Sequence, residues 1–171
     1  MQIRLYGTVN DSIVDGPGLR YTVFTQGCPH HCPGCHNPQS HDMQGGYIQE
    51  TDEIIKEIDQ NPLLDGVTFS GGEPFMQMVP LIDLAKEIKQ RGLHLMIYSG
   101  FTYQEIMDMG KEAKELLSLC DTLVDGRFVL NLRSLQLLYK GSSNQRIIDI
   151  QESLKQNQVI EQKVNEYGEF I

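Results

Sequence analysis

Residues 66–100 read GVTFSGGEPFMQMVPLIDLAKEIKQRGLHLMIYSG, and this stretch decides the fold class of the chain. It begins with a run from Gly66 to Ser70 that predicts a strand ending in a tight glycine turn. A helix is predicted next, and its inward positions are Val79, Ile82, Ala85 and Ile88. Gly92 ends that helix, and LHLMIYSG predicts a second strand. Strand, helix and strand in this order predict a parallel βαβ unit.

The same alternation continues on both sides of this unit. Further strands are predicted at 2–6, 21–26, 121–126 and 146–150, and further helices begin at Thr51 and Thr102 and cover 111–119. These units are too few for a closed eight-fold barrel. We therefore expect an α/β fold, an incomplete βα barrel open at one side, built as a single domain from residues 1–171.

The composition is that of an ordinary globular protein, with 171 residues, 40% hydrophobic and 22% charged. A formal net charge of −9 disfavours a non-specific hold on nucleic acid or anionic membrane, because both require a basic face. The chain shows neither a signal-peptide pattern nor an apolar run long enough to span a membrane. We expect a cytoplasmic protein without nucleic-acid or membrane partners, in which clustered cysteines are metal ligands or catalytic groups rather than disulfides.

Three of the four cysteines lie in one short loop, TQGCPHHCPGCHNPQ, at residues 25–39. Cys28, Cys32 and Cys35 are spaced C-x3-C-x2-C, which is one thiol short of a closed metal site. One interpretation is a structural zinc site completed by one of the nearby histidines, His30, His31, His36 or His41. The other is a four-iron, four-sulfur cluster with three thiolate ligands and one open iron. Cys120 follows an apolar helix face and is predicted to be a core residue.

Four short motifs follow predicted strands: QGC, SGGEP, YSG and VDG. In parallel sheets the carboxyl ends of the strands meet at one edge, where ligands bind. These motifs are therefore expected to converge on one site.

The residues around the cysteines resemble a longer signature, G-x-G-x-R-x3-F-x2-G-C-x3-C-x2-C-x-N. Its matching positions are Gly16, Gly18, Arg20, Phe24, Gly27, Cys28, Cys32, Cys35 and Asn37. This pattern is similar to that of the glycyl-radical-enzyme activating family in the radical S-adenosylmethionine superfamily. The resemblance implies a [4Fe-4S] cluster on Cys28, Cys32 and Cys35. It also implies reductive cleavage of S-adenosylmethionine to a 5′-deoxyadenosyl radical, which takes a hydrogen atom from a glycine of a larger enzyme.

The resemblance also implies cofactor-binding residues. Gly71, Gly72 and Glu73 are expected to hold the methionine end of S-adenosylmethionine, since glycines admit a close backbone and a carboxylate accepts from an ammonium group. Many superfamily members carry an aromatic residue just before the third cysteine, where this chain has Gly34. The adenine contact is then expected either from the side chain of His36 or from backbone groups of Gly34, Cys35 and His36. Ser99 and Asp125 are expected at the ribose or the carboxylate, although a plain turn role for Asp125 is an equal alternative.

The stretch KGSSNQR, Lys140 to Arg146, resembles activators of anaerobic ribonucleoside-triphosphate reductase. The side chains of Ser142, Asn144 and Gln145 are expected either to face the pocket or to cap a loop. The resemblance implies the glycyl-radical subunit of that reductase as partner and a donor such as reduced flavodoxin. The alternatives are an activator of pyruvate formate-lyase or another glycyl-radical enzyme, a radical enzyme acting on a small molecule, and a zinc-stabilised binding module.

Overall fold

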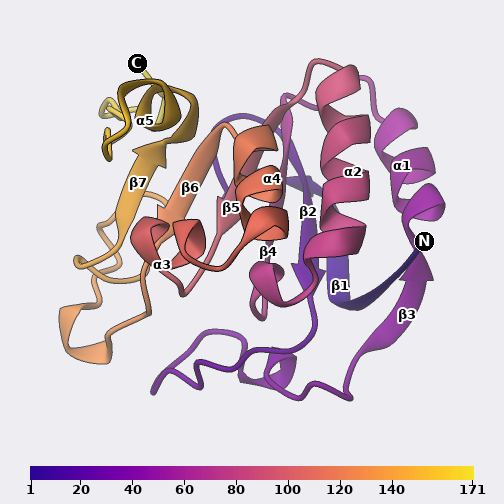
Figure 1. The fold of residues 1–171 in the computed structure, drawn as a ribbon, viewed down its shortest axis with the longest axis horizontal. Helices are drawn as coiled ribbons and strands as arrows, with labels where there is room; N and C mark the ends of the chain where they lie inside the picture. Colours follow the sequence, from indigo (N-terminus) through magenta and orange to yellow (C-terminus); the bar gives the residue numbers. More distant parts are fainter.

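The computed structural model describes all residues from Met1 to Ile171 and contains one seven-stranded sheet (Figure 1). The strands are β1 (Gln2–Ser12), β2 (Arg20–Thr25), β3 (Tyr47–Glu50), β4 (Gly66–Gly71), β5 (His94–Tyr98), β6 (Thr122–Asp125) and β7 (Arg146–Asp149). The α-helices are α1 (Thr51–Asp59), α2 (Met78–Gln90), α3 (Tyr103–Met107), α4 (Lys111–Leu119) and α5 (Ile150–Gln156). Three short 3-10 helices are η1 (Pro38–Ser40), η2 (Pro74–Met76) and η3 (Leu130–Leu132).

The strand order is β3-β1-β2-β4-β5-β6-β7. The four middle strands run parallel, which confirms the βαβ unit expected for β4, α2 and β5. The outer strands β1, β3 and β7 pair antiparallel with their neighbours. For β7 this differs from a purely parallel sheet, because residues 126–145 join it to β6 without a crossover helix. The sheet has two free edge strands, so the predicted incomplete α/β barrel is confirmed.

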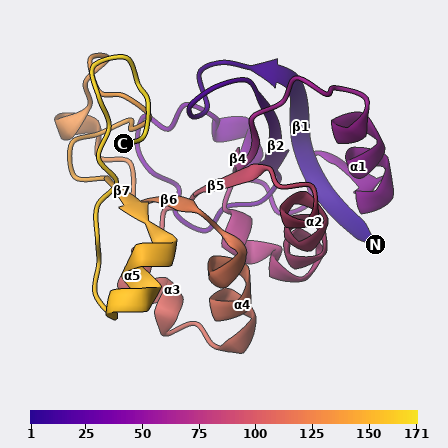
Figure 2. The same cartoon turned by 90° about the horizontal axis from the view of Figure 1, so that it is seen from above.

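The two faces of the sheet differ in composition because side chains alternate along each strand. In β5, Leu95 and Ile97 belong to the main hydrophobic core, whereas Met96 belongs to a smaller cluster on the other face. Helices α2 and α4 lie on one side of the curved sheet, and the chain that follows α5 crosses to the other side (Figure 2). On the face of the sheet opposite the main core, β2 and β4 carry buried polar residues such as Arg20 and Thr68. This leaves the concave face free to build a polar site.

The structure differs from the sequence-based expectation in three local details. Val79, predicted to point inward, is 49% exposed, and buried Leu81 and Leu84 widen the apolar face of α2 instead. Strand β3 and helix α5 were not predicted. Strand β3 has four residues and is largely exposed, so it carries no alternating pattern. Helix α5 begins directly after β7, where the Asp149 side chain caps it by accepting from the amide of Glu152. None of the helices is long and apolar enough to cross a membrane.

Candidate active site

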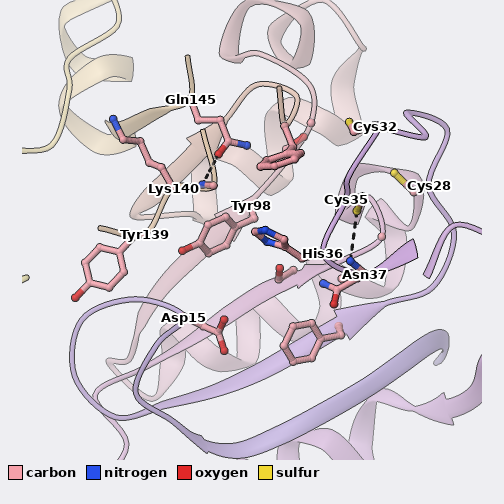
Figure 3. A pocket seen from close by; sticks show the side chains of 18 of the residues that line it. Asp15, Cys28, Cys32, Cys35, His36, Asn37, Tyr98, Tyr139, Lys140 and Gln145 are labelled. Atoms are coloured by element: carbon pink, nitrogen blue, oxygen red, sulfur yellow. Dashed lines mark hydrogen bonds between the residues drawn. The ribbon is translucent and has the colours of Figure 1, made fainter. Parts of the chain in front are cut away.

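A cavity of about 720 Å³ opens at the carboxyl ends of strands β2, β4, β5 and β6. Each of the four strand-end motifs contributes to its lining, through Cys28, Gly71, Ser99 and Gly126. The predicted convergence of these motifs is therefore confirmed. Figure 3 shows the three loop cysteines on one side of the cavity and Tyr139 on the opposite side.

The cysteine loop, residues 25–39, is closed by the side chain of Gln26. Its amide Nε2 donates hydrogen bonds to the carbonyl oxygens of Gln39, at 2.9 Å, and Asp42, at 2.8 Å. Gln26 is almost fully buried and therefore ties the start of the loop to its end. The sequence analysis did not single out this residue, although it directly precedes the glycine of the QGC motif.

The three loop thiols are free and differ in burial. Cys28 is buried, and Cys32 and Cys35 are half-buried. Burial raises the pKa of the Cys28 thiol, and the backbone amides of His30 and His31 oppose that rise. A thiol must lose its proton to bind a metal, so the positive charge of bound iron would have to offset the desolvation of Cys28.

The arrangement of the thiols distinguishes between the two metal sites that the sequence allowed. No three His, Cys, Asp or Glu side chains converge on the position of a single metal ion. The three thiols nevertheless line one cavity, together with residues of the other strand-end motifs. A four-iron cluster binds each thiolate through a different iron, so it needs separated sulfur atoms on a shared wall. This donor set fits such a cluster.

The two glycines of the SGGEP turn pack against the start of the cysteine loop. Gly71 has φ +97°, and a Cβ at this position would overlap the backbone of Thr25. A Cβ on Gly72 would overlap the carbonyl oxygen of Gly27. The amide of Gly72 donates to Thr25 O at 2.7 Å, and the amide of Glu73 donates to Gly27 O at 2.8 Å. Both glycines therefore allow two backbones to approach, and their contact with the cofactor stays a prediction.

Glu73 is fully buried and is bonded to four protein groups. Its Oε1 accepts from His30 Nε2 at 2.8 Å, from Ser99 Oγ at 2.8 Å and from the amide of Gly100 at 2.7 Å. Its Oε2 accepts from the amide of Phe75 at 2.9 Å. Glu73 lies behind the cavity wall, whereas Ser99 and Gly100 line the cavity. The carboxylate thus connects the ends of β4 and β5 to the cysteine loop, and a contact with a cofactor ammonium stays a prediction.

Asp125, expected near the ribose or the carboxylate, lies at the end of β6 and is 1% exposed. Arg146 binds both carboxylate oxygens, with Nη2 at 2.6 Å and Nε at 3.0 Å. The same carboxylate accepts from the amide of Tyr103 at the first turn of α3. Hydrogen bonding to Asp125 raises the pKa of Arg146. Asp125 does not line the cavity, and its contact with a ligand stays a prediction.

Phe128, the last residue of the VDGRF segment that follows β6, lies beside the third cysteine. A Cβ on Gly34 would lie 3.4 Å from Cε1 of Phe128, and the backbone of Gly34 has φ +76°. The rings of His36 and Phe128 have their centroids 5.2 Å apart. Both rings line the cavity, whereas Gly34 does not. The only sequence signal for Phe128 is its place two residues after the VDG motif.

The GSSNQ stretch holds the turn that follows β6. Gln145 Nε2 donates to Gly126 O at 2.9 Å, and Asn144 Nδ2 donates to Arg127 O at 2.8 Å. Ser142 Oγ accepts from the amide of Val129 at 3.1 Å. Gln145 also lines the cavity. Ser142 and Asn144 therefore cap a loop, whereas Gln145 both caps the loop and faces the cavity.

Two charged side chains that the sequence analysis missed lie on the side of the cavity away from the cysteines (Figure 3). Asp15 Oδ2 accepts from Ser12 Oγ at 2.5 Å and from Thr22 Oγ1 at 3.1 Å. Lys140 lies on the segment that precedes GSSNQ. Among the residues that line the cavity, Asp15 is the one carboxylate and Lys140 the one amine. The DGPG sequence around Asp15 was the available signal for the first of them.

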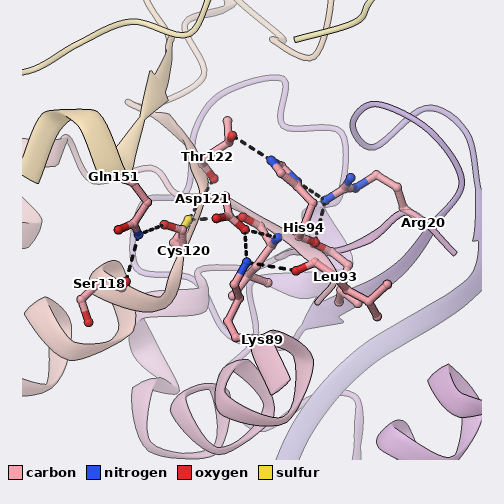
Figure 4. A network of polar contacts seen from close by, with 11 residues as sticks. Arg20, Lys89, Leu93, His94, Ser118, Cys120, Asp121, Thr122 and Gln151 are labelled. Atoms are coloured by element: carbon pink, nitrogen blue, oxygen red, sulfur yellow. Dashed lines mark hydrogen bonds and ion pairs between the residues drawn. The ribbon is translucent and has the colours of Figure 1, made fainter. Parts of the chain in front are cut away.

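Arg20 of the signature lies below the cavity in a buried polar network (Figure 4). Its guanidinium donates to Thr68 Oγ1 at 2.7 Å, to Val67 O at 2.9 Å and to Pro17 O at 3.0 Å. Its Nη2 also lies 3.0 Å from Nδ1 of His94. Burial lowers the pKa of Arg20 to about 10. Arg20 therefore fixes the glycine-rich loop before β2 to strand β4.

The chain is similar to several known proteins. Residues 14–148 match the family described as "4Fe-4S single cluster domain". The anaerobic ribonucleoside-triphosphate reductase-activating protein of Escherichia coli (strain K12) is 33% identical over 141 residues, which cover 78% of this chain and 90% of that protein. The pyruvate formate-lyase-activating enzyme of Clostridium pasteurianum is 40% identical over 113 residues, covering 61% of this chain and 48% of that enzyme. The crystal structure of QueE from Escherichia coli matches with a TM-score of 0.47 at 17% identity, over 60% of this chain and 54% of that chain.

The family match covers most of the chain and includes all three loop cysteines. The cofactors that follow from it are one [4Fe-4S] cluster and S-adenosylmethionine. The chain therefore belongs to the radical S-adenosylmethionine superfamily, within the family of activating proteins that carry a single 4Fe-4S cluster domain.

Proposed function

We propose that this protein activates an anaerobic ribonucleoside-triphosphate reductase by generating a glycyl radical on its glycyl-radical subunit. One observation carries the proposal: three free thiols with the family spacing line the same cavity as the turns that end β4, β5 and β6. The choice of partner is supported by relatives named as activators of that reductase and by the GSSNQ stretch.

When bound, the cluster and S-adenosylmethionine supply a one-electron reductive cleavage that yields a carbon-centred radical. The chain contributes binding and orientation. Its proposed cluster ligands are Cys28, Cys32 and Cys35, and its proposed cofactor-binding residues are Gly34, Cys35, His36, Gly71, Gly72, Glu73, Ser99 and Asp125. Of these, Glu73 and Asp125 act from behind the cavity wall, where they hold the turns that face the ligand. Phe128 and His36 cover one wall with aromatic surface and limit the access of water there.

The open side of the sheet suits a substrate that is part of a large protein. The cavity rim includes Ile13 and Val14, each 74% exposed, on the loop between β1 and β2. A flexible segment of a partner that carries the target glycine can enter there without unfolding the activator. The proposed electron donor is a small carrier such as reduced flavodoxin. We place the reaction in the cytoplasm, without a nucleic-acid or membrane partner, in keeping with the net charge of −9.

Anaerobic reconstitution followed by electron paramagnetic resonance tests the proposal. The reduced protein, S-adenosylmethionine and the reductase from the same cell should give a doublet signal, split by the remaining α-hydrogen of the glycine. The matched control is the reductase with its radical glycine changed to alanine, which should give no signal. A colourless protein without iron after reconstitution would refute the cluster and with it the function.

Pyruvate formate-lyase is the second candidate partner, because its activating enzyme from Clostridium pasteurianum is 40% identical over the matched part. Running the same experiment with pyruvate formate-lyase separates the two partners. A doublet with the lyase alone would assign the chain to that partner, and a doublet with the reductase alone supports our choice.

A further inference from the structure

The imidazole of His30 turns inward from the cysteine loop and is buried in the wall of the cavity. His30 lies midway between Cys28 and Cys32, and both of its chain neighbours, Pro29 and His31, are exposed. Its side chain is only 5% exposed, and its Nε2 lies 2.8 Å from Oε1 of Glu73. A carboxylate has no hydrogen to donate, so Nε2 of His30 must donate this hydrogen bond.

The ring also has a fitted slot between two strand-end turns. Its centroid lies 4.5 Å from that of Phe101 in an edge-on arrangement. A Cβ on Gly100 would overlap the imidazole, so the glycine leaves room for it. The neighbouring His31 differs: it is exposed, and its ring contacts His41 in the same part of the chain. His30 therefore connects the cysteine loop to the ends of both β4 and β5.

We propose that His30 is a positioning residue that fastens the cysteine loop to Glu73 and so holds the cluster ligands in a fixed relation to the Gly-Gly-Glu turn. The ends of the loop are already tied by Gln26, but its middle, between Cys28 and Cys35, has few other anchors. An ordered loop has already lost its conformational freedom, so less free energy is spent when a ligand binds. The same hydrogen bond stabilises the buried carboxylate of Glu73, because His30 supplies one of its four hydrogen-bond donors.

This inference rests on the proposed function only for the identity of the ligands, which are the cluster on the loop and S-adenosylmethionine at the turn. Three variants of the full chain test it. His30→Ala removes the donor, His30→Gln keeps an N–H donor of similar reach, and His31→Ala is the matched control in the same loop. The first measurement is amide hydrogen exchange of residues 28–36, with and without the reconstituted cluster. The second is the affinity of the reconstituted protein for S-adenosylmethionine, measured together with the reduction potential of its cluster.

In His30→Ala the loop amides should exchange about tenfold faster or more, because one charge-assisted hydrogen bond is lost. The affinity for S-adenosylmethionine should fall about tenfold, and the potential should shift, with iron content retained. His30→Gln should restore both properties to within about threefold of the parent, and His31→Ala should match the parent.

Exchange in His30→Ala that equals the parent would overturn the proposal, and so would a His30→Gln protein that behaves like His30→Ala. Hydrogen exchange in the cluster-free chain does not depend on the reaction. A parent protein that fails to bind S-adenosylmethionine would therefore refute the proposed function while the exchange data still decide the role of His30.

Discussion

The carbonyl oxygen of Gly27 occupies the space that a side chain on Gly72 would need. This contact follows from the register of the sheet, in which Thr25 at the end of β2 pairs with Gly71 at the end of β4. The turn proposed to hold S-adenosylmethionine and the loop proposed to hold the cluster are thus packed backbone to backbone. A substitution that displaces the turn is therefore expected to displace the loop as well.

Substitution of Gly72 should therefore affect both functions. Gly72→Val places a branched side chain against Gly27, and the overlap should lower the free energy of unfolding by about 1–3 kcal/mol. Cluster content and affinity for S-adenosylmethionine should fall together. Gly7→Ala is the control, because nothing lies within 4 Å of a Cβ there. Urea unfolding and iron analysis check the prediction, and a Gly72→Val protein with normal cluster content and stability would contradict it.

The four cysteines should separate into two classes. Alanine at Cys28, Cys32 or Cys35 should abolish cluster-dependent cleavage of S-adenosylmethionine, since each is proposed to supply one of three ligands. Cys120 is fully buried in the main core, and burial raises the pKa of its thiol. Cys120→Ala should keep full iron content and activity, at a cost of about 1 kcal/mol in stability. Full iron content and activity in Cys32→Ala would refute the ligand assignment.

The ion pair between Asp125 and Arg146 should stabilise the end of β6. Arg146→Ala leaves the carboxylate of Asp125 buried and without its charged partner, so the free energy of unfolding should fall by about 3 kcal/mol. Arg127→Ala is the matched control: its contact with Glu105 is 3.8 Å long and solvent-exposed, and its loss should cost less than about 1 kcal/mol. Thermal and urea unfolding of the two variants measure the difference. Equal losses would show that the buried pair contributes no more than a surface pair.

His94 should make stability depend on pH. Burial, together with the positive charge of Arg20, lowers its pKa from 6.5 to about 4 in the folded protein. Between these values the unfolded chain binds more protons than the folded chain, so stability falls as the pH falls from about 6.5 towards 4. The full effect is about 3 kcal/mol.

The His94→Gln variant provides the comparison, because its side-chain oxygen can still accept from Arg20 while it does not titrate. Urea unfolding of the cluster-free chain should show a shallower loss of stability in this variant between pH 6.5 and 4. Identical slopes in parent and variant would contradict the prediction. Because both proteins share all carboxylates, acid protonation of those groups largely cancels in the difference.

The sequence determined the features that depend on neighbouring residues along the chain. Hydrophobic spacing placed a helix between the strands β4 and β5, and the turn at Gly71 marked the end of β4. The capping box of Thr102 and Glu105 located the start of α3. The cysteine spacing predicted the cluster ligands, and the strand-end motifs identified the edge of the sheet where the cavity lies. Each of these signals is local, because it arises from the periodicity or the conformational limits of a single segment.

Only the tertiary structure decided which distant side chains meet. The sequence predicted that Glu73 belongs to the site. Its hydrogen bond to His30, however, joins residues 43 positions apart and depends on the parallel register of β2 and β4. The place of Phe128 beside Gly34, and the antiparallel return of β7, also depend on how residues 126–145 fold back onto the sheet. Such contacts are set by register, packing volume and hydrogen-bond geometry across elements, and a pattern within one segment does not contain these quantities.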